Sequence, residues 1–424
     1  MYRHRTRAIG VTLVASVGLG LSACSTDDRP SAGSGQTITL GTDDTERIEP
    51  VIDAFEEANP DVTVEIQSGG NSYQEFLRTR LASNSAPDVL RTFPGAGNVA
   101  GVISLDESGS LADLSQQSWT DQLSEQQRNL FATSDDRVLS VPVGALALGA
   151  VYNTSALDEI GASIPTTYSE VLQLCQTAAD NGKFAFAIHQ KGGGFVPSFA
   201  MAAPLVYGPN PQFTQDQLDG TATFSNSSWT DVFAIQLEML EAGCFQEGPN
   251  GTDWNAAAAL VASGDATATL TFSDTTALDQ LASDTSFEIA PFPVTDDPAD
   301  RYLAVADSNG FGVNVNSENK DLAMDFIEFI GSEEGQNVFA TAAKGVPALP
   351  NDSFEPSSVN QETIIEYQTS GKVAAWPDQE WPGPEIAQAA DLVIQGLVDG
   401  SVSPSDAVKQ LDEAWDKSVA NADR

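Results

Sequence analysis

The side chains best suited to chemistry in this chain are tryptophans on predicted loops. Trp376 and Trp381 stand five residues apart in AAWPDQEWPGPEI, where the prolines exclude a long helix and disfavour a central strand. Trp254 comes just before a predicted helix in GTDWNAAAALVASG. Because an indole is a flat apolar face that fits the C–H face of a pyranose ring, these tryptophans are candidates for stacking on a neutral sugar. The alternative for each is packing against a core.

Stacking is the prediction for Trp254 and for one of the final pair. We expect Trp376 to point toward the ligand, and Trp381 to lie at the rim or under the helix that begins near Pro384. The remaining tryptophans lie in helical patterns and are assigned to the core: Trp119, Trp229 and Trp415.

Polar residues that directly follow predicted strands form the second group of candidates. Ligands of open α/β sheets bind beyond the carboxyl ends of the strands, where side-chain donors and acceptors can meet hydroxyl groups. The ligand-binding candidates are Thr42, Asp43, Asp44, Asn71, Arg91, Phe93, Ser273, Asp274, Asn309 and Gly310. Structural alternatives stay open: helix capping for the acids after the first strand and for Ser273 and Asp274, a tight turn around Asn71, and pairing with a surface acid for Arg91.

The chain contains few of the histidines that common catalytic sites require. Of its two histidines, only His189 lies beyond the predicted leader, so a Ser-His-Asp triad or a multi-histidine metal site has few possible members. We therefore expect no catalytic residue, no metal and no cofactor. Two alternatives remain: a pair of carboxylates for glycoside hydrolysis, and a cage of tryptophans and acids around a cationic solute.

The overall charge is strongly negative, with 60 Asp and Glu against 19 Lys and Arg and a formal net charge of −41 at pH 7. Contacts to phosphates need a basic surface, so we predict no nucleic-acid partner. Steering of anionic solutes is also disfavoured. Neutral or cationic small ligands fit this charge better.

The N-terminus has the pattern of a bacterial signal peptide. Three arginines at positions 3, 5 and 7 precede an uncharged apolar run, Ile9 to Leu21, that is too short to span a bilayer comfortably. The run ends in LSAC, which resembles the lipobox of bacterial lipoproteins. The resemblance implies a signal peptide over 1–23, lipidation of Cys24, a flexible tether over 24–35 and a location on the outer face of the cell membrane, held by lipid only. An ordinary cleaved signal is the alternative.

Two further cysteines, Cys175 and Cys244, lie in predicted helices of the middle segment. In an oxidising exterior such a pair suggests one disulfide. Two buried free thiols are the alternative.

The candidate ligand-binding residues are carried by a predicted alternation of strands and helices. Strands are predicted over 36–42, 62–66 and 86–91, with amphipathic helices around 48–55 and 73–81 between them, an order that predicts a parallel sheet. Further along, the pattern indicates two strands within 138–153, a helix after Pro165 that runs to Ala179, strands over 286–295 and 302–315, a helix pair over 319–343, and two final helices over 384–400 and 403–419.

The ordered set of these segments resembles a known family. The segments are FEEANPDVTVEI, SYQEFLRTRLASNSAPDVL, VLSVPVGALALGAVYN, PFPVTDD, SNGFGVNVNSENKDLAMDFIEFIGSEEGQNVFA and GVPALP. Together they resemble the carbohydrate-binding, extracellular solute-binding lipoproteins of ABC importers over nearly the whole mature chain. Ser308-Asn309-Gly310 and ATATLTFSDTT depart from the family's usual Gly-Gly pair and Met-rich strand, which leaves the particular sugar undetermined.

The resemblance implies an α/β fold of the two-lobe, periplasmic-binding-protein-like type II, with a hinge and a ligand cleft between the lobes. One lobe would comprise 36–142 and 308–345, and the other 143–307 and 346–424. It also implies a monomer that captures a neutral sugar or oligosaccharide and delivers it to the ABC permease in the membrane.

Overall fold

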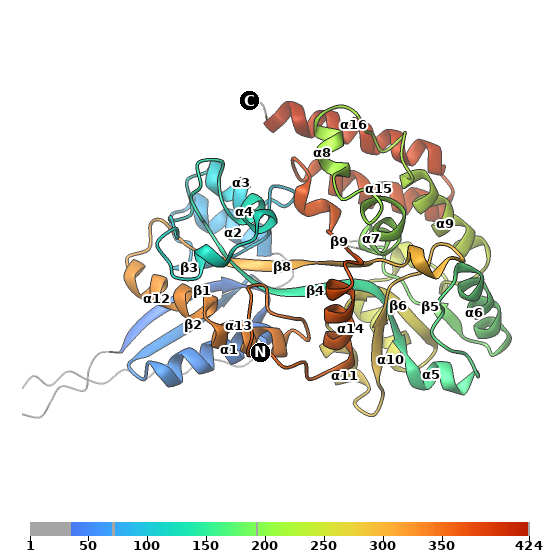
Figure 1. Ribbon diagram of the computed structural model, residues 1–424, viewed down its shortest axis with the longest axis horizontal. Helices are drawn as coiled ribbons and strands as arrows, with labels where there is room; N and C mark the ends of the chain where they lie inside the picture. The colour runs from blue at the N-terminus through green and yellow to red at the C-terminus, as the bar shows by residue number, and fades with distance from the viewer. Residues whose placement is uncertain (1–34, 70–72, 192–193, 423–424) are drawn as a thin grey trace, which may run out of the picture. The chain divides into compact units, whose positions relative to one another are not determined.

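The computed structural model describes residues 35–69, 73–191 and 194–422, and the chain from Gln36 onward forms a compact unit (Figure 1). The predicted signal peptide, the lipidation site Cys24 and most of the tether lie outside the described residues. So does Asn71, one of the ligand-binding candidates.

The first part of the chain folds as its periodicity predicts. Its elements in order are β1 (Gln36–Thr42), α1 (Thr45–Ala58), β2 (Val62–Ser68), α2 (Tyr73–Ala82) and β3 (Val89–Thr92). β1 pairs in parallel with both β2 and β3, which confirms the predicted parallel sheet. α1 buries the predicted apolar face, since Ile48, Val51, Ile52 and Phe55 are its buried residues.

Two long antiparallel strands connect the two halves of the sheet. β4 (Val141–Asn153) and β8 (Leu303–Val313) lie side by side in Figure 1. The other strands are β5 (Phe184–Phe186), β6 (Ala266–Phe272), β7 (Phe287–Ala290) and β9 (Val373–Ala374). The sheet order is β2-β1-β3-β8-β4-β6-β5, with β7 paired to β4 and β9 paired to β8. The two strands therefore stand between the β1–β3 group and the group of β5 and β6.

The prediction of two strands within 138–153 is wrong, because β4 is a single strand of 13 residues. Gly144 has a φ of +56°, a conformation that glycine adopts without steric cost, and the chain continues as a strand on both sides of it. β8 supplies partners for the first half of β4, and β6 and β7 supply them for the second half. These partners belong to distant parts of the chain, so local sequence could not indicate them.

The remaining helices lie around this sheet. They are α3 (Val102–Glu107), α4 (Glu125–Phe131), α5 (Thr154–Glu159), α6 (Tyr168–Asp180), α7 (Val196–Ala202), α8 (Phe213–Leu218), α9 (Trp229–Glu241), α10 (Trp254–Ala262), α11 (Thr276–Leu281), α12 (Lys320–Gly331), α13 (Glu333–Ala342), α14 (Val359–Thr369), α15 (Glu385–Asp399) and α16 (Pro404–Ala422). A short 3-10 turn, Pro377–Glu380, lies between β9 and α15.

Trp119, Trp229 and Trp415 are buried in the main hydrophobic cluster, which confirms their assignment to the core. Trp229 contacts Phe233 and Phe224, with ring centroids 5.7 Å and 5.6 Å away. The aromatic side chains of the second half of the chain thus form much of its packing.

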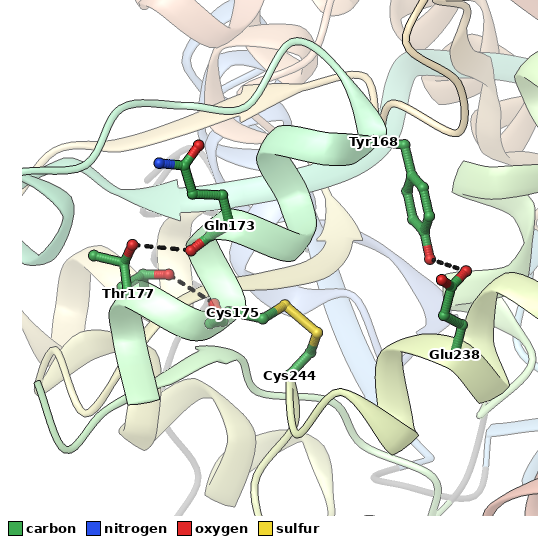
Figure 2. The surroundings of a disulfide bond; sticks show 8 residues. Tyr168, Gln173, Cys175, Thr177, Glu238 and Cys244 are labelled. Carbon is green, nitrogen blue, oxygen red and sulfur yellow. Dashed lines mark hydrogen bonds between the residues drawn. A yellow bond between two sulfur atoms is a disulfide. The ribbon is translucent and has the colours of Figure 1, made fainter. Parts of the chain in front are cut away.

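The predicted disulfide between Cys175 and Cys244 is present (Figure 2). It joins α6 to the segment that follows α9, across a sequence separation of 69 residues. The Tyr168 hydroxyl of α6 donates a hydrogen bond of 2.9 Å to Glu238 of α9, which is a second link between the two helices. Within the described ranges, the helices are all too short or too polar to cross a membrane.

Candidate ligand-binding site

A cavity of about 210 Å³, called the inner cavity below, lies beside Trp376. Its aromatic wall comprises Phe93, Phe195, Phe199, Phe272 and Trp376. The Phe272 and Trp376 rings are in contact, with centroids 5.0 Å apart. Polar groups on the lining come from Arg47, Arg91, Asn98, Ser308, Asp378 and Gln379. An apolar surface with a few convergent polar groups is typical of a small-molecule site.

A second cavity of about 520 Å³, the outer cavity, shares Arg47, Val196 and Phe272 with the inner one. Its lining is more polar and includes Asp43, Asp44, Glu46, His189, Trp254 and Asp274. The Trp254 ring meets His189 edge to face, with centroids 5.5 Å apart. Because the two cavities share lining residues, they form neighbouring compartments of one site.

Arg47 connects the two sides of the outer cavity. Its Nε lies 3.0 Å from Asp44 and 3.1 Å from Asp274, which follows β6. Asp44 occupies the N-cap position of α1, yet its side chain makes no capping hydrogen bond. It accepts instead a bond of 3.0 Å from the Nδ2 of Asn309 on β8. The capping alternative is therefore not realised for Asp44, and its carboxylate joins three segments at the site.

Arg91 combines both of its possible roles. It forms an ion pair with Asp43, as the structural alternative required, and it also lines the inner cavity. Its guanidinium lies over the Phe93 ring, 4.6 Å from the centroid, in a cation–π contact. The hydroxyl of Tyr73 donates to the Arg91 carbonyl over 2.7 Å, which fixes the backbone at this end of β3.

Several candidates support the site from behind instead of lining it. Thr42 is fully buried, and its Oγ1 accepts the backbone N–H of Asp44 at 2.9 Å. Ser273 is fully buried, and its Oγ accepts the N–H of Ala147 on β4 at 3.1 Å. Asn309 is also fully buried and contacts the site through Asp44 and through Ser308, whose Oγ donates to its Oδ1.

Gly310 and Trp381 are packing residues in this structure. A Cβ at Gly310 would lie 2.4 Å from the Ser140 Oγ, so glycine is needed there for close approach of the strands. Trp381 is 1% exposed and packs edge to face against Phe199 and Phe224. It lies under the aromatic wall, whereas Trp376, at 7% exposed, lines the inner cavity.

Two buried carboxylates lie near the crossing strands. Burial raises the pKa of Asp378 to about 6, against the influence of nearby backbone N–H groups. Burial also raises the pKa of Asp307 to about 6, although Gln127 donates to its carboxylate over 2.9 Å. Asp307 lines a separate cavity, on the opposite face of β8 from Ser308.

Several residues that line the two cavities were not among the ligand-binding candidates predicted from the sequence. They are Arg47, Asn98, His189, Phe195, Phe199, Phe272, Asp378 and Gln379. His189 packs on Trp254, where burial lowers the pKa of its imidazole. Asp378 and Gln379 lie between the two tryptophans of the loop, so their position in the sequence was a usable signal.

A sequence profile of the family described as bacterial extracellular solute-binding protein matches residues 41–337. The chain belongs to this family. The solute-binding protein is 25% identical over 239 residues to the melibiose/raffinose/stachyose-binding protein MelE of Bacillus subtilis (strain 168), and the match covers 54% of each chain. The chain thus spans about half the length of this relative.

Longer matches agree with this family. The solute-binding protein is 21% identical over 348 residues to the multiple sugar-binding protein of Streptococcus mutans serotype c (strain ATCC 700610 / UA159), covering 79% of each chain. It also resembles the structure of a family 1 extracellular solute-binding protein from Bifidobacterium longum subsp. infantis, with a TM-score of 0.67 and 23% identity. That match covers 91% of this chain and 100% of the other. The predicted periplasmic-binding-protein-like α/β fold is confirmed.

Proposed function

We propose that this solute-binding protein captures a neutral sugar or oligosaccharide outside the cell and delivers it to the permease of an ABC importer. The observation that carries the proposal is the inner cavity, where an aromatic wall faces side chains with hydrogen-bond donors and acceptors. A sugar has apolar C–H faces and polar edges, and such a surface can meet both. The names of the two relatives, which refer to melibiose, raffinose, stachyose and multiple sugars, support the same ligand class.

The size of the site supports a ligand longer than one sugar ring. The inner cavity is smaller than the roughly 300–1,000 Å³ of typical small-molecule sites. The adjoining outer cavity adds space and a second aromatic ring, that of the partly buried Trp254. A chain of sugar units could place one unit against Trp376 and extend toward Trp254.

The charge pattern of the outer cavity argues against a cationic solute. Three of the four acids on its lining are paired: Asp44 and Asp274 with Arg47, and Asp43 with Arg91. A cationic ligand would have to compete with these arginines. We therefore propose that the protein binds its sugar for transport and does not hydrolyse it.

The mode of action follows from the proposed lobes, 36–142 with 308–345 and 143–307 with 346–424. The chain passes between them along β4 and β8, and again near Val346, whose N–H and carbonyl bond to Ala145 at 3.0 Å and 2.7 Å. We propose that the lobes move about these three crossings. A lipidated Cys24 would hold the monomer at the membrane.

A thermal-shift panel tests the function. The probes are melibiose, raffinose, stachyose and a maltodextrin, set against spermidine and glycine betaine. A ligand that binds only the native state raises the melting temperature with concentration, so we expect a shift with at least one sugar and none with the cations. Chromatography of the same mixtures should show uncleaved sugar. A shift with the cations alone, or turnover of a glycoside, would overturn the proposal.

A further inference from the structure

The polar groups of the inner cavity are incompletely satisfied. Among the described residues, buried polar atoms without a hydrogen-bond partner include Arg91 Nε, Trp376 Nε1, Asp378 Oδ1 and Gln379 Oε1, all from side chains that line this cavity. Leaving a buried donor or acceptor unpaired is costly, and native proteins rarely do so without a functional reason. The unpaired set contains two donors and two acceptors, which a polyhydroxylated ligand can complement.

Asp378 stands out in this set because it carries a full negative charge when ionised. Three other carboxylates near the two cavities have ion-pair partners: Asp43 pairs with Arg91, and Asp44 and Asp274 pair with Arg47. Glu46 lines the outer cavity but is exposed to solvent. Asp378 has no ion pair in the parts of the chain that the structure describes, and it faces the cavity beside Trp376. Its Oδ1 atom therefore remains available to a ligand, while backbone N–H groups of the turn act on the same carboxyl group.

The backbone holds Asp378 in place on two sides. On one side, Gly97 approaches so closely that an added Cβ would meet the Asp378 carbonyl oxygen at 1.9 Å. On the other, Gln379 donates from Nε2 to the Asp307 carbonyl of β8 over 2.7 Å. The 3-10 turn that carries Asp378 is thus positioned before a ligand arrives, which lowers the entropic cost of binding.

We propose that Asp378 is a ligand-recognition residue of this site, whose carboxylate accepts hydrogen bonds from neighbouring hydroxyl groups of the sugar unit that stacks on Trp376. This inference rests on the proposed function and assigns to it the residue that selects for vicinal hydroxyls. A carboxylate offers acceptors on both oxygens, so it can bind two hydroxyl donors at once. Such charge-assisted bonds are stronger than neutral ones.

The charged groups around Asp378 are few. Those that line the same cavity are Arg91, from β3, and Arg47, from α1. Glu380 follows in the same turn, and burial raises the pKa of its carboxyl. Asp307 lies beyond Gln379, on the other side of β8. The segments around Phe93, Leu146, Phe199 and Phe272 contribute apolar side chains.

The pKa of Asp378 predicts the direction in which sugar affinity changes with pH. Burial raises the pKa of Asp378 to about 6 in the ligand-free protein. Hydroxyl donors from a sugar stabilise the ionised carboxylate and so lower its pKa in the complex. Ligand binding near pH 6 must then release protons, and affinity must increase as the pH rises from about 5 to about 7. A carboxylate with no ligand contact would not produce this coupling.

The test is calorimetry with melibiose, raffinose and stachyose, each alone, on the wild type and on Asp378→Asn. Because hydrogen bonds to a charged group are lost, we expect the Kd of the variant to rise by roughly 10- to 100-fold at pH 7. The matched control is Asp284→Asn, which removes one negative charge at an exposed position and should leave the Kd unchanged. Melting curves of all three proteins check that each is folded.

A second measurement does not depend on the variant. Wild-type titrations at pH 6 in two buffers of different ionisation enthalpy report proton release directly. Release in the wild type and its loss in Asp378→Asn support the proposal. Sugar binding with no proton release, or with an unchanged Kd in the variant, overturns the role of Asp378 and leaves the proposed function standing. Failure of the wild type to bind any sugar overturns the proposed function and this inference with it.

Discussion

At the scale of single residues, two tryptophans that the sequence presents alike are both buried, but only Trp376 lines the inner cavity. Trp376 follows β9 directly, and the pairing of β9 with β8 brings it against the inner cavity. Trp381 comes after the 3-10 turn and directs its ring into the group of Phe195, Phe199 and Phe224. We propose that the Trp376 ring contacts the ligand, whereas the Trp381 ring packs behind the aromatic wall.

Substitution of the two tryptophans should separate binding from stability. Trp376→Ala removes the stacking surface, and we expect a loss of roughly 2 kcal/mol in sugar binding, about 30-fold in Kd. Trp381→Ala removes a fully buried ring and should reduce the free energy of unfolding by about 3–5 kcal/mol. Calorimetry and urea denaturation measure the two quantities. An unchanged Kd in Trp376→Ala would show that this ring is not the stacking surface.

At the scale of elements, local periodicity predicted the strands and helices whose partners are close in sequence. The sequence predicts all of the first five elements, because the apolar residues of each recur at the spacing of a strand or of a helix. These elements are β1, α1, β2, α2 and β3. The residues of the site were harder to predict, because the cavity lining comes from segments that are far apart in the sequence. Examples are the segments of Arg91, Phe195, Phe272 and Trp376. The rule that ligands bind after strand ends found Arg91 and Asp274, but also selected Ser273, which turns inward.

A contact between two loops closes the inner cavity next to Asp378. Gly95 and Gly97 lie against the carbonyls of Gln379 and Asp378, and a Cβ on either glycine would lie 1.9 Å from the oxygen. Gly97→Ala must push the two loops apart, because backbone atoms cannot yield as a side chain can. We expect a destabilisation of about 1–3 kcal/mol and weaker sugar binding.

The control for this variant is Gly251→Ala, since an added Cβ at Gly251 meets open space. It should change neither the melting temperature nor the Kd measurably. If Gly97→Ala bound sugar as well as the control, the loop contact would have no part in forming the site.

The disulfide between Cys175 and Cys244 closes a long loop around α7, α8 and α9. The loss of loop-closure entropy in the unfolded chain gives about 4 kcal/mol of stabilisation for a loop of this size. The double variant Cys175→Ala with Cys244→Ala should therefore have a markedly lower free energy of unfolding. Denaturation with and without a reductant measures this, and the reductant should destabilise the wild type but not the double variant.

At the scale of the whole molecule, the position of the ring that we assign to the sugar requires motion. Trp376 is 7% exposed, and the inner cavity is bounded by residues of both proposed lobes, such as Phe93 and Phe199. The Trp376 ring is largely covered in the structure, and Gly97 of one proposed lobe lies against the turn of Asp378 in the other. Separation of the proposed lobes about the crossings of β4 and β8 would open the path.

Small-angle scattering can detect this separation. Hinge closure around a ligand is a known response of two-lobe proteins, so a sugar that binds should reduce the radius of gyration of the wild type. Trp376→Ala, at sugar concentrations that saturate the wild type but not the variant, should remain expanded. The same sugar added to Gly251→Ala should compact it as it does the wild type. A verified ligand that leaves the scattering of the wild type unchanged would mean that the site fills without lobe movement.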